Sequence, residues 1–294
     1  MKQIKLCFDV GGTYIKYGCF DDRNEWLEKG QMLTDCSDID RFFQPIIQFI
    51  FTLEKKYKIM AIGLSFPGFI DSSSGQATLA GAIIPLHGKN IREELLDRLK
   101  RKYPVWVEND ANCAALAEMH VGNAQEVDSF VLVTLGTGVG GAIIEGGKLV
   151  SGAHFKGGEF GMMVTDFNHS SFKTLHELAS TSALIYAYRN EKKIPQEVPV
   201  AGEEIFEQLD DPQVQAIVSQ WANYIAVLLF NLSVTLDPQK ILIGGGVSQN
   251  PQLLPLLETA LKRNPHWQDF AIPIATCRYY NDSGVIGARH LIQV

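Results

Sequence analysis

The sequence predicts an α/β protein made of two similarly built domains. Apolar, strand-like segments alternate with helical segments along most of the 294 residues, which is the pattern of an α/β fold. A series of strand, glycine turn, strand, tight turn and third strand occurs twice, beginning at Ile4 and again at Phe130. The length of the chain also suits two domains.

The two copies of this series carry the turn signals expected of hairpins, because glycines and polar residues separate their apolar runs. The first copy comprises strand 4–10, glycine turn 11–13, strand 14–20 and polar turn 21–24, and the second comprises strand 130–135, glycine turn 136–140, strand 141–144 and turn 145–147. Such a repeat favours a duplicated architecture.

The remaining segments are expected to alternate between helices and strands. Helices are expected where apolar residues recur at helical spacing, and strands where short apolar runs are bounded by proline or glycine. Expected helices cover residues 40–56, 91–102, 111–120, 214–236 and 283–292, and expected strands cover 61–66, 105–107 and 241–243. The last helix is expected to pack back onto the first domain. We therefore predict an N-terminal domain of residues 1–117 with 281–294, and a C-terminal domain of residues 118–280.

Composition and charge argue against several classes of function. The formal net charge of −7 gives no electrostatic support for binding nucleic acid or an anionic membrane. No stretch approaches the roughly 18 apolar residues of a membrane span, and the first residues do not resemble a signal peptide. The five cysteines are odd in number and scattered, as expected of reduced thiols. We expect a cytoplasmic protein without a nucleic-acid or membrane partner.

Asp9 and the turn Gly11-Gly12-Thr13 form the first candidate site. Consecutive glycines let backbone N–H groups approach a ligand without a Cβ in the way, and a turn of such groups suits phosphate oxygens. Asp9, at a strand end, suits Mg²⁺ held through water, and Thr13 suits donation to a phosphate. The alternative is a tight hairpin with a polar entrance.

Two further glycine runs extend this interpretation. Thr137 and Gly138 lie in the run from Gly136 to Gly141, which repeats the glycine turn of the first copy. A pair of such turns on facing domains suits a polyphosphate. Gly245 and Gly246 follow an apolar strand, where glycines would let adenine and its ribose lie against the backbone. Plain hairpin and strand-to-helix turns remain the alternatives.

Asn109 and Asp110 lie between an expected strand and an expected helix. Asp110 at this position suits either a helix cap or a general base for phosphoryl transfer, with Asn109 as a hydrogen-bonding group beside it. Glu159, among glycines, offers a carboxylate suited to accept from two neighbouring sugar hydroxyls. Glu177 could do the same from a helix start, although a lone helical Glu is more often solvated. None of the seven histidines shows metal-ligand spacing, and His169 and His176 are the nearest pair.

Taken together and in order, these motifs resemble those of the ROK family of bacterial sugar kinases. The motifs are Asp9-x-Gly-Gly-Thr-x-x-Lys16, Ser65-x-Pro-Gly68, Glu108-Asn-Asp-Ala-Asn112, Gly136-Thr-Gly-x-Gly-Gly141, Gly158-Glu-x-Gly161 and Gly244-Gly-Gly-Val247. Each motif alone is weak, whereas the ordered set is specific and covers nearly the whole chain. The resemblance implies an actin-like, hexokinase-type ATPase fold, with two duplicated α/β domains around a cleft, and agrees with the repeat.

The resemblance also implies roles for individual residues. It implies that Asp110 is the catalytic base, and that Asn109, Glu159 and Glu177 bind sugar hydroxyls in a pocket lined by Gly68. It assigns the ATP phosphates and Mg²⁺ to the first two glycine turns and the nucleoside to the third. The ATP neighbourhood so implied comprises Asp9, Gly11, Gly12, Thr13, Thr137, Gly138, Gly245 and Gly246. A homodimer is expected from the resemblance alone.

The sequence departs from the family pattern in two places. Met162 stands where members often have a zinc-binding His, and the segment from Asp166 to Glu177 contains no cysteine. We predict that no zinc is bound, because zinc needs several thiolate or imidazole ligands. The segment from Leu79 to Ile84 also lacks the asparagine expected of a glucokinase sugar loop.

The zinc-less pattern is most similar to the β-glucoside kinases, which phosphorylate the 6-hydroxyl of glucose in cellobiose-like sugars. Glucokinase and N-acetylmannosamine kinase are the alternatives. A sugar-sensing ROK-type regulator is disfavoured, because the first strand starts at Ile4 and leaves no room for a helix-turn-helix domain. A phosphate-releasing hydrolase is disfavoured by the expected sugar ligands.

Overall fold

The computed structural model describes residues 1–166 and 172–293. Two compact units make up the chain. Unit 1 contains Met1–His120, Ser151–Lys156 and Asp282–Val294, and unit 2 contains Val121–Val150 and Gly157–Asn281. Each unit is described by itself below. The predicted bounds 1–117 with 281–294 and 118–280 stay a prediction.

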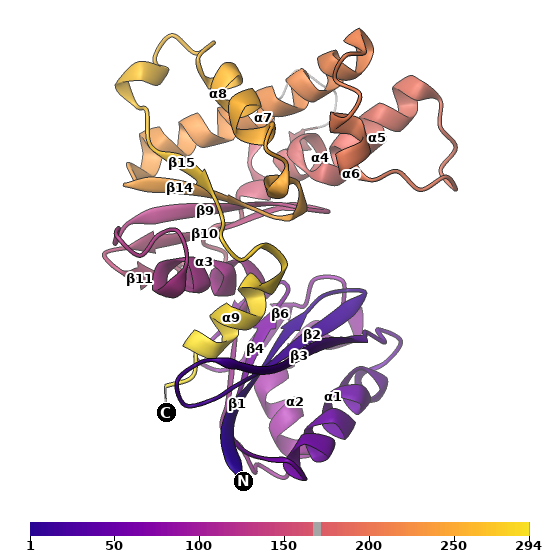
Figure 1. Cartoon of the computed structure of the whole chain (residues 1–294), viewed down its shortest axis with the longest axis vertical. Helices are drawn as coiled ribbons and strands as arrows, with labels where there is room; N and C mark the ends of the chain where they lie inside the picture. The colour runs from indigo at the N-terminus through magenta and orange to yellow at the C-terminus, as the bar shows by residue number, and fades with distance from the viewer. Residues whose placement is uncertain (167–171, 294) are drawn as a thin grey trace. The chain divides into compact units, whose positions relative to one another are not determined.

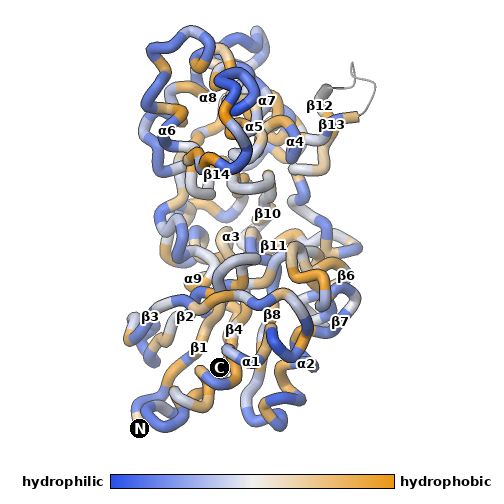
Figure 2. Tube along the Cα trace, turned by 90° about the vertical axis from the view of Figure 1, so that its right-hand side faces the viewer, coloured by the Kyte–Doolittle hydropathy of each residue, from blue (hydrophilic) through white to orange (hydrophobic). Residues whose placement is uncertain are grey.

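Unit 1 is built on a five-stranded sheet in the order β3-β2-β1-β4-β8. Figure 1 labels β1, β2, β3 and β4 of this sheet. The strands are β1 (Lys2–Val10), β2 (Tyr14–Phe20), β3 (Trp26–Leu33), β4 (Tyr57–Phe66) and β8 (Val105–Asn109). The first three strands form an antiparallel meander, whereas β4 pairs parallel with β1 and β8 pairs parallel with β4. β4 is drawn largely in hydrophobic colours in Figure 2, as expected of a central strand that pairs with a parallel strand on each side.

The register of the parallel strands aligns their carboxyl ends. Asp9 pairs with Ser65 across β1 and β4, and Ser65 pairs with Glu108 across β4 and β8. Polar residues at the ends of three neighbouring strands therefore form one row. In open α/β sheets ligands bind outside this edge.

The helices of unit 1 begin with side-chain caps where the sequence offers them. Asp38 accepts from the backbone N–H of Arg41, and Asn90 accepts from that of Glu93, which satisfies donors that a helix start leaves unpaired. The helices are α1 (Ile39–Glu54), α2 (Ile91–Arg98), α3 (Asp110–Val121) and α9 (Ser283–His290). A small sheet comprises β5 (Phe69–Asp71), β6 (Gln76–Leu79) and β7 (Lys89–Asn90), with the 3₁₀ turn η1 (Ile84–Leu86) between the last two.

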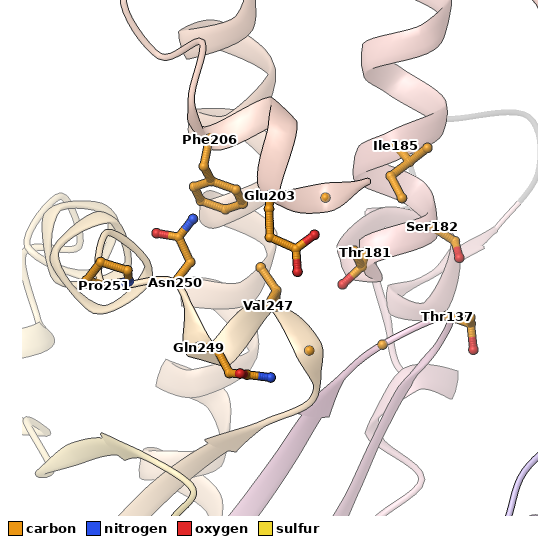
Figure 3. Close-up of a pocket in the computed structure, with 13 residues that line it drawn as sticks. Thr137, Thr181, Ser182, Ile185, Glu203, Phe206, Val247, Gln249, Asn250 and Pro251 are labelled. Atoms are coloured by element: carbon orange, nitrogen blue, oxygen red, sulfur yellow. The ribbon is translucent and has the colours of Figure 1, made fainter. Parts of the chain in front are cut away.

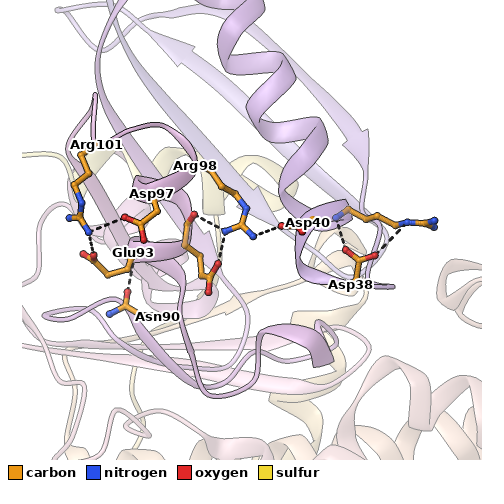
Figure 4. Close-up of polar contacts among 9 residues, drawn as sticks. Asp38, Asp40, Asn90, Glu93, Asp97, Arg98 and Arg101 are labelled. Atoms are coloured by element: carbon orange, nitrogen blue, oxygen red, sulfur yellow. Dashed lines mark hydrogen bonds and ion pairs between the residues drawn. The ribbon is translucent and has the colours of Figure 1, made fainter.

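α2 is shorter than predicted. The prediction of a helix to residue 102 is wrong at its carboxyl end, because the helix stops at Arg98. Lys100 and Arg101 have φ values of 52° and 55°, which a right-handed helix cannot include. Ion pairs hold this end of the helix: Arg98 bonds Glu94 and Asp40 of α1, and Arg101 bonds Glu93 and Asp97 (Figure 4).

α9 packs directly against the backbone of unit 1. A Cβ at Gly63 of β4 would lie 2.2 Å from the carbonyl oxygen of Ala288, and one at Gly287 would lie 1.8 Å from that of Cys113. Only glycine permits so close an approach of two backbones. Beneath α9 lies a buried apolar cluster that includes Cys7, Ala61 and Val285.

Unit 2 repeats the sheet of unit 1 with the order β11-β10-β9-β14-β15. Its strands are β9 (Phe130–Leu135), β10 (Val139–Glu145), β11 (Lys148–Leu149), β14 (Lys240–Gly244) and β15 (Ile274–Thr276). The first three are antiparallel and the last two add in parallel, as in unit 1. The duplication predicted from the sequence is thus present in strand order and direction, and the predicted α/β class is confirmed.

The helical part of unit 2 surrounds one long helix. α7 (Pro212–Leu236) is the one described helix that is long and apolar enough to span a membrane, and half of its most apolar window is buried. Trp221 and Leu229 of α7 lie in the main core of the unit, which supports a core helix. The other elements are α4 (Leu175–Ala179), α5 (Thr181–Lys192), α6 (Gly202–Phe206), α8 (Leu253–Leu261), β12 (Val164–Asp166), β13 (Lys173–Thr174), and the 3₁₀ turns η2 (Phe160–Met162), η3 (Gly246–Gln249), η4 (Trp267–Asp269) and η5 (Tyr280–Asp282).

His290, at the end of α9, is held in its neutral form. Its ring stacks on that of His120 with centroids 4.2 Å apart, and the Arg289 guanidinium donates to its Nε2. Burial first, and then the charges of Arg289, His120 and Lys5, lower the pKa of His290 to about 3. A proton added here would be poorly solvated and would face positive neighbours.

We predict that His290 makes unit 1 less stable as the pH falls. Between its usual pKa of about 6.5 and its native value, only the unfolded chain binds the proton, so the free energy of unfolding decreases with decreasing pH. The His290 contribution between pH 7 and pH 5 is about 1 kcal/mol after a discount for partial exposure. Urea unfolding at both pH values should show a smaller loss in H290Q than in the wild type. The exposed His266 supplies the control H266Q, and equal losses in all three proteins would contradict the prediction.

Candidate active site

Asp9, next to the last residue of β1, lies beside two groups that hold its carboxylate. Ser65 Oγ donates to Asp9 Oδ1 at 2.6 Å, and Lys16 Nζ lies 3.9 Å from Oδ2. The start of α9 presses on the same carboxylate, since a Cβ at Gly284 would lie 2.2 Å from Oδ1. Burial raises the pKa of Asp9, and Ser65 and Lys16 oppose that rise. The site therefore fixes Oδ1 of Asp9 and limits the access of water to its carboxylate.

The glycine turn after Asp9 has the geometry of a hairpin. The Gly11 N–H donates to Tyr14 O at 2.9 Å, and Thr34 Oγ1 donates to Gly11 O at 2.8 Å. A Cβ at Gly12 would lie 3.1 Å from the Ala82 Cβ, so a larger residue would crowd the turn. Gly12 and Thr13 are exposed, which leaves this face of the turn accessible to a ligand.

Asn109 ties the start of α3 to the turn after β4. Its Nδ2 donates to Gly68 O at 2.9 Å, and its Oδ1 accepts from the Asn112 N–H at 3.1 Å. Asn109 therefore caps α3. Asp110 accepts from the Ala111 N–H at 2.9 Å and is exposed. The helix thus begins with its Asp110 side chain accessible to solvent.

Gly68 is required by the backbone of this turn. Its φ is +103°, and a Cβ would lie 2.1 Å from Leu79 O. The hydrogen bond from Asn109 brings Gly68 and Asn109 together, and the sugar pocket that the resemblance implies for them stays a prediction. Within unit 1 the structure places Asp9, Gly68, Asn109 and Asp110 at or just beyond the carboxyl ends of β1, β4 and β8.

Glu108 stabilises the start of α3 through two hydrogen bonds. The sequence predicted no role for this residue. Its Oε1 accepts from the Asn109 N–H at 2.8 Å and from Asn112 Nδ2 at 2.9 Å. Burial raises the pKa of Glu108, so the neutral acid is favoured relative to an exposed Glu. The signal available in the sequence was a carboxylate at the end of an otherwise apolar strand.

Unit 2 contains a pocket of about 480 Å³ beside the second and third glycine runs (Figure 3). Its walls combine apolar side chains with open backbone and a few polar groups. The lining residues are Gly136, Thr137, Thr181, Ser182, Ile185, Gly202, Glu203, Phe206, Gly246, Val247, Gln249, Asn250 and Pro251. Such a combination of apolar surface, open backbone and polar side chains suits a small molecule that carries both apolar and polar groups.

Of the predicted nucleotide residues, Thr137 and Gly246 line this pocket, whereas Gly245 is not among its lining residues. Gly245 has φ +91°, and a Cβ there would lie 2.1 Å from Leu135 O. Gly138 faces the ring of His176 instead, because a Cβ there would lie 2.3 Å from His176 Cε1. Sequence reasoning missed His176 and the helix residues Thr181 and Phe206, because their proximity arises only from tertiary packing.

Glu159 and Glu177 differ in environment. Burial raises the pKa of Glu159, as expected of a carboxylate in a partly enclosed site. Glu177 is exposed and completes a capping box, with its carboxylate accepting from the N–H and Oγ1 of Thr174. Those bonds lower the pKa of Glu177. The geometry thus gives Glu177 a structural role, and its predicted role as a sugar ligand stays a prediction.

Metal ligands do not cluster in the part of the chain that the structure describes. No group of three or more His, Cys, Asp or Glu residues is arranged to hold an ion within residues 1–166 and 172–293. His169 lies outside the described residues.

The duplicated sheets, each with a glycine turn between its first two strands, define an actin-like, hexokinase-type ATPase fold. The chain belongs to the ROK family, whose sequence model matches residues 5–294. The β-glucoside kinase of Klebsiella pneumoniae is 37% identical over 286 residues, covering 96% of this chain and 93% of that protein. The Lmo2764 protein of Listeria monocytogenes, described as a putative N-acetylmannosamine kinase, has 32% identity and a TM-score of 0.86 over 99% of this chain and 98% of its own. A ROK family protein from Streptococcus pneumoniae, solved with sucrose, has 26% identity and a TM-score of 0.85 over 97% and 96%.

We predict that alanine destabilises the protein at Gly245 but not at the adjacent Gly246. G245A needs a Cβ at positive φ against the Leu135 carbonyl and should lower the free energy of unfolding by about 2 kcal/mol or more. Gly246 has no atom within 4 Å of a built Cβ, so G246A and G246V should unfold like the wild type. Because the sequence predicts the nucleoside beside Gly246, both should also raise the KM for ATP, G246V more strongly, by filling part of the pocket. Thermal unfolding and ATP titrations measure the two effects, and a destabilised G246A or a stable G245A would contradict the geometry.

Proposed function

We propose that this chain, an ATP-dependent sugar kinase of the ROK family, phosphorylates the 6-hydroxyl of glucose in a β-glucoside such as cellobiose. The observation that carries the phosphotransfer is the accessible carboxylate of Asp110 beside Asn109, which is itself bonded to Gly68. The full-length similarity to a β-glucoside kinase and Met162 in place of a zinc-binding His support this choice of sugar. N-acetylmannosamine kinase activity is the second candidate, favoured by the description of the Listeria protein.

In this proposal Asp110 removes the proton of the 6-hydroxyl as that oxygen attacks the γ-phosphorus of ATP. The bond between the γ-phosphorus and the bridging oxygen breaks, and ADP leaves with the electron pair. Asn109 is fixed by Gly68 O at one end and by α3 at the other, so its amide is available in a single orientation. The base itself must lie within hydrogen-bond reach of the hydroxyl.

Nucleotide binding is proposed for the pocket of unit 2. Ile185, Phe206 and Val247 offer apolar surface for a base, and Figure 3 shows the Glu203 carboxylate among them. Thr137 and Gly138 remain the proposed phosphate neighbours in that unit, with Gly11, Gly12 and Thr13 the proposed counterparts in unit 1. Gly245 and Gly246 are the proposed nucleoside side.

The residues around Asp9 suit Mg²⁺. Asp9 supplies a carboxylate oxygen of the kind that Mg²⁺ prefers, and a nearby cation would offset the burial that raises its pKa. When bound with ATP, the ion would neutralise charge on the phosphates. The proposal does not include bound zinc. It does include a cytoplasmic location and a homodimer.

A sugar panel tests the proposed substrate. ADP release should be measured with Mg²⁺-ATP and glucose, N-acetylmannosamine, N-acetylglucosamine, fructose, cellobiose or gentiobiose. We expect the highest kcat/KM with the two β-linked disaccharides, because the proposed substrate is a β-glucoside with a second sugar ring. Such a preference would imply a pocket that extends beyond the glucose ring. A preference for N-acetylmannosamine would establish the second candidate, and no turnover with any sugar would overturn the kinase assignment.

The role of Asp110 is tested by D110N, which keeps the size of the side chain and removes the base. We expect normal thermal unfolding and a kcat lower by about 10²–10⁴-fold, the range typical of general-base catalysis. Asp22, an exposed turn residue of the same unit, supplies the control D22N with unchanged kcat. A D110N enzyme that keeps most of its turnover would rule out this base.

A further inference from the structure

A short segment after β11 belongs to unit 1 although unit 2 flanks it on both sides. This segment, Ser151–Lys156, joins unit 1 by its contacts, whereas Val121–Val150 and Gly157–Asn281 form unit 2. Phe155 within it has φ +56°. A bulky residue in the left-handed region is strained, and such strain persists where the surrounding structure enforces it. The segment is therefore held in one particular conformation on unit 1.

The strained residue places Lys156 above an aromatic ring next to the proposed sugar site. Lys156 Nζ lies 5.3 Å from the centroid of the Phe69 ring. Phe69 directly follows Gly68, whose carbonyl accepts from Asn109. The ammonium group of Lys156 therefore lies over the residue that follows Gly68, whose carbonyl binds Asn109. Since Lys156 is exposed, this contact adds little stability and does not by itself explain the strain at Phe155.

Two exposed apolar side chains lie in the strand paired with Phe69 and in the turn that follows that strand. Phe69 pairs with Leu79 across β5 and β6, and Leu79 is 40% exposed. Ile84, at the start of η1, is 71% exposed on a turn closed by the bond from the Ile83 N–H to Ala80 O. Leu79 and Ile84 thus offer apolar surface to a ligand on the segment that pairs with Phe69 and continues from that strand.

We propose that Lys156, Leu79 and Ile84 form an outer subsite for the second sugar ring of a disaccharide, with Phe69 as the positioning residue for Lys156. This inference rests on the proposed function and names the residues that select a disaccharide over glucose. The ammonium group has three donors and no acceptor, which suits sugar hydroxyls as acceptors. Leu79 and Ile84 contact the C–H face of the ring. Phe69 restricts the lysine, so less conformational entropy is lost when the sugar binds.

The test compares gentiobiose and glucose as substrates of the full-length wild type, K156M and F69L. K156M should lower the gentiobiose-to-glucose ratio of kcat/KM roughly tenfold or more, because a hydrogen bond from a charged donor is lost. The change should lie in the KM for gentiobiose, with kcat retained. F69L should lower the ratio less, and the K156M/F69L double variant should lose no more than K156M alone, since Phe69 acts through Lys156.

Two controls separate this subsite from general effects. Lys58 is an exposed lysine near the start of β4, about 25 Å along that strand from Phe66, and K58M should leave the ratio unchanged. Phe51 of α1 is 48% exposed and supplies F51L. Thermal unfolding of each variant checks the fold, and exposed Lys156 keeps the test usable if F69L is unstable.

Each other outcome overturns the subsite. An unchanged ratio in K156M would show that Lys156 does not contact the second ring. An equal loss of kcat with both sugars would assign Lys156 to the transferred phosphate. A wild type that phosphorylates glucose but no disaccharide would overturn the subsite and leave the sugar kinase intact, whereas a wild type inactive on every sugar would overturn the proposed function as well.

Discussion

The register of the parallel strands β1, β4 and β8 is the constraint on which the unit 1 site depends. It pairs Asp9 with Ser65 and Ser65 with Glu108, so that polar side chains from three distant parts of the sequence form one row. A slip of one residue would turn each of these side chains to the other face of the sheet. The apolar residues that precede them are buried and fix the register. The site is thus positioned by the core beneath it.

Unit 2 contains a sheet of the same topology, but a pocket lies beside its glycine turns. This pocket is lined by Gly136 and Thr137 of the second glycine run and by residues of α5, α6 and η3. The backbone approach at Gly245 to Leu135 is as close as that at Gly68 to Leu79. In both units glycine lets a turn pack against a neighbouring segment. What differs is which side chains then surround the turn.

The strands of the two repeat copies, β4, β8, β14 and the glycine turns could be predicted from the sequence because each depends on local order. The short strands β5, β6, β7, β12, β13 and β15 were not predicted. Asn109 and Gly68 were also recognisable from their motifs, although the bond between them was not. The end of α2 was misplaced because left-handed Lys100 and Arg101 carry no local signal. The cap made by Glu177, the approach of His176 to Gly138 and the contribution of Phe206 depend on packing between segments far apart in sequence. Single-residue reasoning has no access to such packing.

The position of α9 has a consequence for synthesis of the chain. β1 and β4 are made early, yet Cys7, Ala61 and Gly63 are covered by residues from 282 onward. On the ribosome these surfaces stay uncovered while all of unit 2 is translated, and nascent chains with exposed apolar surface are prone to aggregate. Unit 2, by contrast, is complete in sequence at Asn281. Unit 1 is therefore the first to emerge and the last to be complete, and during that interval its uncovered apolar surface is open to aggregation.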